Sequence, residues 1–147
     1  MSATAITRTL EPDGSVVIAD SRARFAYRRV APGVLDIAIS GTDSGQFGTA
    51  TLDEVALALV RERPLELFID ASEASMPTVG VSRDWTRFFA LNRDSLKRVS
   101  VLVSSKSVEL TVAIAQHLSQ TGKLIQIYSD AELFAQRREA AASLSRR

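Results

Sequence analysis

Residues 65–70, Leu-Glu-Leu-Phe-Ile-Asp, form a near-continuous apolar run that ends at an acidic residue. Two further apolar runs follow, over residues 99–103 and 124–128. Strands that are apolar on both faces are typical of a parallel sheet whose faces are covered by helices. The three runs therefore predict the central, parallel strands of an α/β domain.

Helical segments alternate with these runs, and polar residues mark where the helices begin. Residues 51–54 and 129–132 have the capping-box pattern, and Ser82 is the predicted N-cap of a helix that carries Trp85. Alternation of strands and helices implies right-handed crossovers between parallel strands. The helix predicted over residues 108–120 is expected to bury Val108, Val112, Ala115 and Leu118.

The N-terminal part of the chain has a different pattern. Residues 15–19 form a short β-rich run, and residues 22–30 and 34–40 alternate between apolar and polar side chains. Alternation indicates strands with one buried and one solvated face. We therefore expect a mixed sheet with this antiparallel hairpin at its edge and the element order β-β-β-α-β-α-β-α-β-α. Residues 1–147 are predicted to form a single domain, with a frayed N-terminus over residues 1–13 and a polar tail over residues 140–147.

The composition excludes several classes of protein. The 147 residues are 46% hydrophobic and 24% charged, as in an ordinary globular domain. A net charge of +1 supplies no long-range field that would attract nucleic acid. The absence of cysteine excludes disulfides and agrees with a cytoplasmic location. No apolar run approaches the ~18 residues needed to span a bilayer.

Residues that could carry catalysis are sparse. His117 is the single histidine, the carboxylates are dispersed, and the glycines match no phosphate-binding or dinucleotide-binding pattern. We therefore predict that the protein is not an enzyme and holds no metal and no cofactor.

The carboxyl ends of parallel strands are where open α/β sheets meet ligands and partners. The longest predicted connection at these ends runs over residues 71–80 and contains Pro77 and Gly80. Long connections in compact domains are more often functional than short ones. This segment is therefore the predicted functional loop.

The second half of the chain resembles a known family. The matching features are the strand that ends at Asp70, the loop into a helix bearing Trp85, the Leu-Lys-Arg-Val-Ser-Val-Leu-Val sequence of residues 96–103, and the Ile-Tyr-Ser-Asp-Ala-Glu-Leu-Phe sequence of residues 127–134. These resemble the STAS-like domains, the fold of bacterial anti-sigma-factor antagonists, and in particular the divergent STAS/Sec14-like group of small bacterial proteins.

The resemblance implies a binding module that is switched at the loop after the Asp70 strand. In the typical family this loop carries Asp-Ser-x-Gly, whose serine accepts a phosphate. The corresponding residues here are near Thr78-Val79-Gly80-Val81, and the Asp-Ser pair is missing. Thr78, Ser75 and Ser82 are the candidate phosphoacceptors. The predicted partner-binding or regulatory residues are Asp70, Ser72, Ser75, Thr78, Gly80, Ser82 and Trp85.

Three functions remain open from the sequence. The first is a regulatory or scaffolding module that binds a protein partner, or a second copy of itself, through residues 71–82 and the helix after them. The second is a domain that binds a lipid or another apolar ligand in a cavity under the Trp85 helix. The third is an enzyme that uses carboxylates. A deep apolar pocket beside Phe88 and Phe89 would favour the second, and a flat exposed patch the first.

Overall fold

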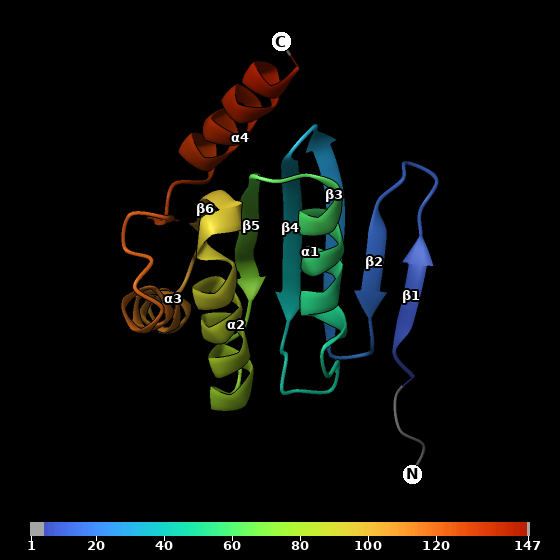
Figure 1. Cartoon of the computed structure of the whole chain (residues 1–147). Coiled ribbons are helices and arrows are strands. Elements are labelled where there is room, and N and C mark those ends of the chain that lie inside the picture. The colour runs from blue at the N-terminus through green and yellow to red at the C-terminus, as the bar shows by residue number, and fades with distance from the viewer. Residues whose placement is uncertain (1–4, 147) are drawn as a thin grey trace.

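The computed structural model describes residues 5–146, in which one sheet carries all of the strands (Figure 1). The sheet has seven strands in the order of the chain, β1-β2-β3-β4-β5-β6-β7. Strands β1 to β4 pair antiparallel, and β4 to β7 pair parallel. The strands are β1 Thr7–Leu10, β2 Val16–Ala19, β3 Ala23–Ala31, β4 Val34–Gly41, β5 Leu65–Ala74, β6 Leu96–Leu102 and β7 Ile125–Tyr128.

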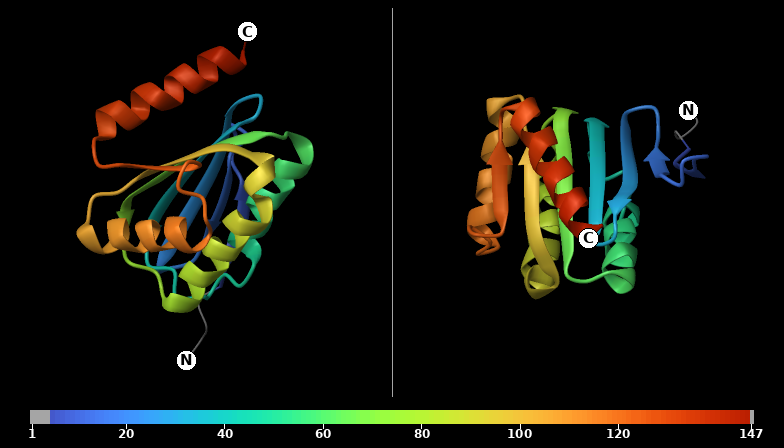
Figure 2. Two further views of the ribbon diagram at one scale, coloured as in Figure 1. Left: turned by 60° about the vertical axis from the view of Figure 1, so that its left-hand side comes forward. Right: turned by 90° about the horizontal axis from the view of Figure 1, so that it is seen from above.

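The helices lie in two unequal layers on the two faces of the sheet (Figure 2). Helices α1, α2 and α3 connect the parallel strands and share one face, whereas α4 follows the last strand and crosses the opposite face. Consecutive right-handed crossovers place connecting helices on the same face when each new strand is added next to the last one. The helices are α1 Ala50–Arg61, α2 Val79–Asn92, the short 3₁₀ helix η1 Arg93–Ser95, α3 Lys106–Leu118 and α4 Ala131–Ser145.

The main hydrophobic core lies between the sheet and helices α1 to α3. On β5, Leu65, Leu67 and Ile69 face this core, while Phe68 faces α4. Since side chains alternate along a strand, one apolar run supplies both layers. The prediction that this strand is covered on both faces is therefore confirmed.

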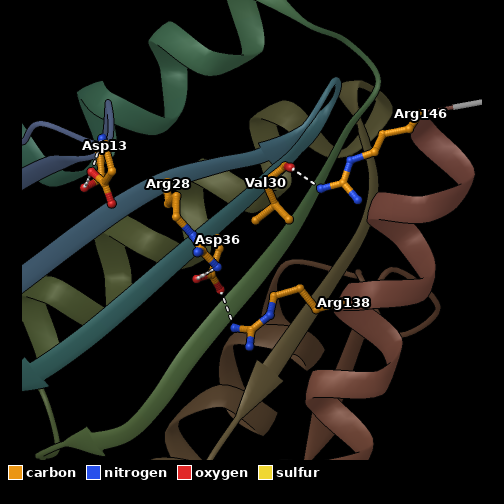
Figure 3. A network of polar contacts seen from close by, with 7 residues as sticks. Asp13, Arg28, Val30, Asp36, Arg138 and Arg146 are labelled. Atoms are coloured by element: carbon orange, nitrogen blue, oxygen red, sulfur yellow. Dashed lines mark hydrogen bonds and ion pairs between the residues drawn. The ribbon is translucent and has the colours of Figure 1, made fainter.

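A smaller core and a set of polar contacts attach α4 to the other face. Phe134 lies edge-on to Phe68, with ring centroids 5.8 Å apart. Arg138 donates to the Asp36 carboxylate at 3.0 Å, and Arg146 donates to the Val30 carbonyl at 3.1 Å (Figure 3). The α4 helix is thus positioned by one buried aromatic ring and by two arginines.

The predicted mixed sheet, with parallel central strands and an antiparallel edge, is confirmed. Two positions within it differ from the expectation. Strand β7 is an edge strand, and β4 of the predicted edge hairpin is the middle strand. The outer antiparallel edge is instead β1, which was not expected as a strand. The reason is that every crossover adds its strand farther from β4, so the last strand necessarily has a free side.

Both chain ends contain more structure than their composition indicated. Residues 7–10 form β1 and pair with β2, so the predicted frayed N-terminus is wrong there, while residues 1–4 lie outside the described residues. Helix α4 continues through the predicted polar tail to Ser145, and Ala142 is fully buried. An alanine such as Ala142 contributes little to a hydrophobic pattern in the sequence. Its small side chain nevertheless allows α4 to lie close to the sheet.

Helix α2 begins earlier than expected, because Thr78 and not Ser82 is its N-cap. Helix α1 begins after Thr49, so Thr51 lies inside the helix and is buried. The cap of α4 is Asp130, whose carboxylate accepts from the backbone N–H groups of residues 132 and 133. The sequence therefore located the helices, but the predicted start of each differs from the observed one by one to four residues.

Candidate functional site

An apolar cavity lies between the sheet and helices α2 and α3. Its volume is about 120 Å³. It opens near the carboxyl ends of β4 and β5, where a parallel sheet typically meets its ligands. Aromatic side chains and small residues share its wall, among them Phe25, Ile69, Trp85, Phe89 and Ala115.

Small residues keep the cavity open. Ala71 and Ala74 on β5 face it from the sheet, and Ala115 faces it from α3. Larger side chains at these positions would fill the space, as core residues do elsewhere in proteins. Trp85 is half-buried at the cavity wall and packs against Phe89, with ring centroids 5.8 Å apart. The α2 helix therefore covers the cavity with aromatic rings.

Gly41 is required where β4 ends beside the cavity. Its φ angle is +82°, and a Cβ atom there would lie 2.0 Å from the backbone oxygen of Arg22. Only glycine combines this backbone conformation with so close an approach. The chain can therefore turn at this point towards the loop over residues 42–49.

Asp43 is the buried carboxylate at the rim of the cavity. Its Oδ1 atom accepts from the Gly45 N–H at 3.0 Å, and its backbone oxygen accepts from the Thr78 N–H at 3.3 Å. Burial raises the pKa of this carboxyl group, and repulsion from Asp20 and Asp84 adds to the rise. Asp43 is not among the site residues predicted from the sequence, and its position just after β4 was the available signal.

The predicted site residues fall on two faces of the sheet. Asp70 and Ser72 project to the face opposite the cavity, because Ile69 and Ala71 project into the main core. The Ser72 N–H and hydroxyl both donate to one Asp70 oxygen, and the Ser104 hydroxyl donates to the Ser72 carbonyl. These two residues therefore form a separate polar cluster.

The other predicted site residues lie together at the start of α2. Ser75, Ser82 and Trp85 border the cavity, whereas Thr78 and Gly80 border a neighbouring hollow shared with Asp43. Because β5 continues to Ala74, the loop after it is shorter than expected and covers only residues 75–78. Among the candidate phosphoacceptors, Ser75 and Thr78 are exposed and Ser82 is half-buried.

No protein-family model and no curated protein matches the sequence. The structure is similar to the crystal structure of an anti-sigma factor antagonist from Mycobacterium paratuberculosis, with a TM-score of 0.54 and 16% identity over 89% of this chain and 99% of that one. It is also similar to an uncharacterised DUF3478-family protein with a SpoIIAA-like fold from Shewanella loihica PV-4, with a TM-score of 0.50 and 16% identity over 92% and 97% of the two chains. The chain has a STAS-like fold. The resemblance inferred from residues 65–134 is thus confirmed for the fold.

The protein also exposes apolar side chains beside this cavity. Met76 in the loop and Val79, the first residue of α2, are 58% and 75% exposed. Such residues on a surface loop are typical of a contact with another molecule when they gather at one place. The structure therefore has a small apolar cavity that Phe89 lines and Phe88 does not, and two exposed apolar side chains near it.

Two kinds of feature are not found in the described part of the chain. Within residues 5–146, no group of three or more acidic or histidine side chains is placed to hold a metal ion. Over the same residues, no helix has the length and apolar character that a membrane crossing requires.

Proposed function

We propose that this STAS-like domain is a regulatory module that binds a protein partner through residues 75–78 and α2. The observation that carries the proposal is the exposure of Met76 and Val79 at the start of α2. The neighbour from Mycobacterium paratuberculosis is named an anti-sigma factor antagonist, and that name describes action on another protein. The resemblance and the lack of cysteine support a bacterial, cytoplasmic setting.

Regulation of this surface would act through the hydroxyl groups of the loop. Thr78 Oγ1 accepts from the Val81 N–H at 3.4 Å, so its side chain lies at the N-terminus of α2. A phosphate there would add negative charge at the positive end of the helix dipole, in a hollow bordered by Arg83 and Arg87 as well as by Asp43 and Asp84. We propose Thr78 as the first phosphoacceptor to test, before Ser75 and Ser82.

Native mass spectrometry of the protein isolated from its own cells tests the proposal. We expect a stoichiometric complex with another protein that is lost in the Val79→Ser variant and kept in the Leu91→Ser variant. Leu91 is an equally exposed apolar residue at the other end of α2, so it controls for lost apolar surface. An unaccompanied monomer, or equal loss in both variants, would contradict the proposal.

The cavity favours a second candidate, a domain that binds a lipid or another apolar ligand. Octanoate is a suitable probe because it joins an apolar chain to a polar head group, and Trp85 supplies a fluorescence signal at the cavity wall. The variant Ala115→Leu fills the cavity and should abolish the response, whereas Ala113→Leu, on a different side of α3, should preserve it. No response of the unmodified protein would exclude this alternative for that ligand class.

A carboxylate-dependent enzyme is the weakest candidate. Asp36 and Glu66 are buried but ion-paired with arginines, which leaves Asp43 as the buried acid beside the cavity. The acids that repel Asp43, Asp20 and Asp84, do not line the cavity, so Asp43 meets no second carboxylate there. We therefore propose a non-enzymatic domain.

A further inference from the structure

Helix α3 has an exposed apolar stripe on its outer face. Leu110, Ile114 and Leu118 follow one another at every fourth residue and are 61%, 50% and 66% exposed. Residues at this spacing are neighbours on one side of a helix. The expectation that Leu118 is buried is therefore wrong, whereas Val108 and Ala115 are buried and Val112 is half-buried against the core.

The inner face of α3 already has its apolar contacts. Val108 and Ala115 are buried against the sheet and the cavity. Helix α3 lies at the outer margin of the helical layer, beside β7 (Figures 1 and 2). A surface helix normally carries polar side chains on the side away from the core. Packing within the fold therefore does not explain why the outer face of α3 carries the apolar stripe.

A cationic hollow adjoins the C-terminal end of this stripe. Its volume is about 680 Å³, and Arg93, His117 and Lys123 lie on its wall. No acidic residue lines it, and within residues 5–146 neither Arg93 nor Lys123 is ion-paired. The cations therefore lie at the C-terminal end of α3, next in the chain to Leu118 and far from Leu110.

The turn after α3 holds this surface in place. The Ser119 and Thr121 hydroxyls are 2.6 Å apart, and both side chains are buried. The Thr121 N–H donates to the Gln116 carbonyl at 3.0 Å, which closes the end of the helix. Lys123 therefore follows a turn whose backbone is held next to α3 by hydrogen bonds.

We infer that the outer face of α3 is a second docking surface, for an amphipathic helix of a partner protein whose acidic residues meet Arg93 and Lys123. The row of three apolar side chains fits the apolar seam of another helix. The cations without acidic partners fit carboxylates at one end of that helix. The inference rests on the proposed protein-binding function but concerns a face separate from residues 75–78.

Charge favours this occupant over a second copy of the chain. An antiparallel α3 pair centred on Ile114 would bring Leu110 against Leu118, but it would also place the cationic end of each copy beside Lys106 of the other. Lys106 is paired with Glu109 of its own helix at 3.1 Å, so that end of a second copy offers no unpaired carboxylate to Arg93 and Lys123. A membrane surface would be better matched by cations along the whole stripe than by cations at one end.

A helical peptide provides the direct test. The probe is about 18 residues long, with leucines spaced to face the stripe and glutamates in its last turn, and binding is measured by fluorescence anisotropy. We expect Leu118→Ser to weaken binding about tenfold. The control is Leu144→Ser on α4, which removes a leucine that is 64% exposed and should change binding less than about twofold.

A charge exchange tests the orientation of the helix. Lys123→Glu should weaken binding of the glutamate peptide, and a peptide with lysines in place of those glutamates should bind this variant better than the unmodified protein. Absence of binding, or equal losses for Leu118→Ser and Leu144→Ser, would overturn the inference. So would Leu118-dependent dimerisation, or Leu118-dependent binding to vesicles of phosphatidylcholine and phosphatidylglycerol. Val79→Ser should leave peptide binding unchanged, so this result is independent of the test at α2.

Discussion

Asp43 and Thr78 connect the loop after β4 with the start of α2. The link is a hydrogen bond from the Thr78 N–H to the Asp43 carbonyl. One of these residues is a buried acid and the other an exposed hydroxyl. Changes of charge at either residue therefore act where the cavity and the proposed partner surface meet.

Asp43→Asn should stabilise the protein at neutral pH. Because burial raises the pKa of the Asp43 carboxyl, the folded state binds its proton more tightly than the unfolded state does, and ionisation costs stability as pH rises through the folded pKa. Asparagine keeps an oxygen that accepts from the Gly45 N–H. The gain in free energy of unfolding, measured by urea denaturation, should shrink as pH is lowered to about 4. A gain in stability that does not change with pH over this range would contradict a raised pKa of the Asp43 carboxyl group.

Thr78→Asp should alter partner binding without unfolding α2. Aspartate caps a helix as well as threonine does, whereas Thr78→Ala should cost about 1 kcal/mol of stability. Thr78→Asn is the matched control, since it caps without charge. Calorimetry against an identified partner should show a larger change for Thr78→Asp than for Thr78→Asn or for Asp130→Asn on α4. Equal affinities would remove this loop from the mechanism.

At the scale of elements, α4 depends on few buried side chains. Phe134 and Ala142 are its buried residues, and Phe134 also lies against Tyr128, with ring centroids 6.1 Å apart. The Arg138 guanidinium covers the Phe134 ring at 5.5 Å from its centre. The helix is thus attached chiefly through one ring, which contacts β5, β7 and its own following turn.

Phe134→Ala should cost about 3–5 kcal/mol of unfolding free energy, since it removes a buried ring and leaves a cavity. Leu133→Ala, at the adjacent and exposed position of the same helix, should cost much less. Chemical denaturation followed by far-UV circular dichroism measures both. A similar cost for the two variants would show that α4 is not attached through Phe134.

At the scale of the molecule, the sheet has a stable middle and two different edges. Strands β4 and β5 pair on both sides and face both cores, whereas β1 is exposed along its whole length. Stability within a protein follows buried contacts and protected hydrogen bonds. The centre of the sheet is therefore the expected last region to open.

Hydrogen exchange should show this gradient. We expect the slowest exchange at β4 and β5, intermediate rates at β7, and the fastest exchange among strands at β1. The measurement is amide exchange read by NMR under native conditions. Protection of β1 equal to that of β5 would indicate that something covers the β1 edge in solution.

Local patterns in the sequence determined the fold class. The apolar runs at residues 65–69 and 99–103 predicted parallel strands, and the alternation of residues 22–40 predicted the antiparallel pair. Both patterns indicate which faces of a strand are buried, and they can be seen in a few consecutive residues. The resemblance to STAS-like domains arose from the same segments, and for this reason it held for the fold.

Only the tertiary structure decided which residues meet. Asp70 and Ser72 follow an apolar run that hides the alternation of faces, so the sequence grouped them with Trp85 although the sheet separates them. The strand order depends on where each crossover places the next strand, which no local pattern encodes. The exposed side of α3 could not be predicted for a similar reason. An apolar residue on a helix indicates that its side chain will be covered, but the sequence does not say whether the covering surface belongs to this chain or to a partner.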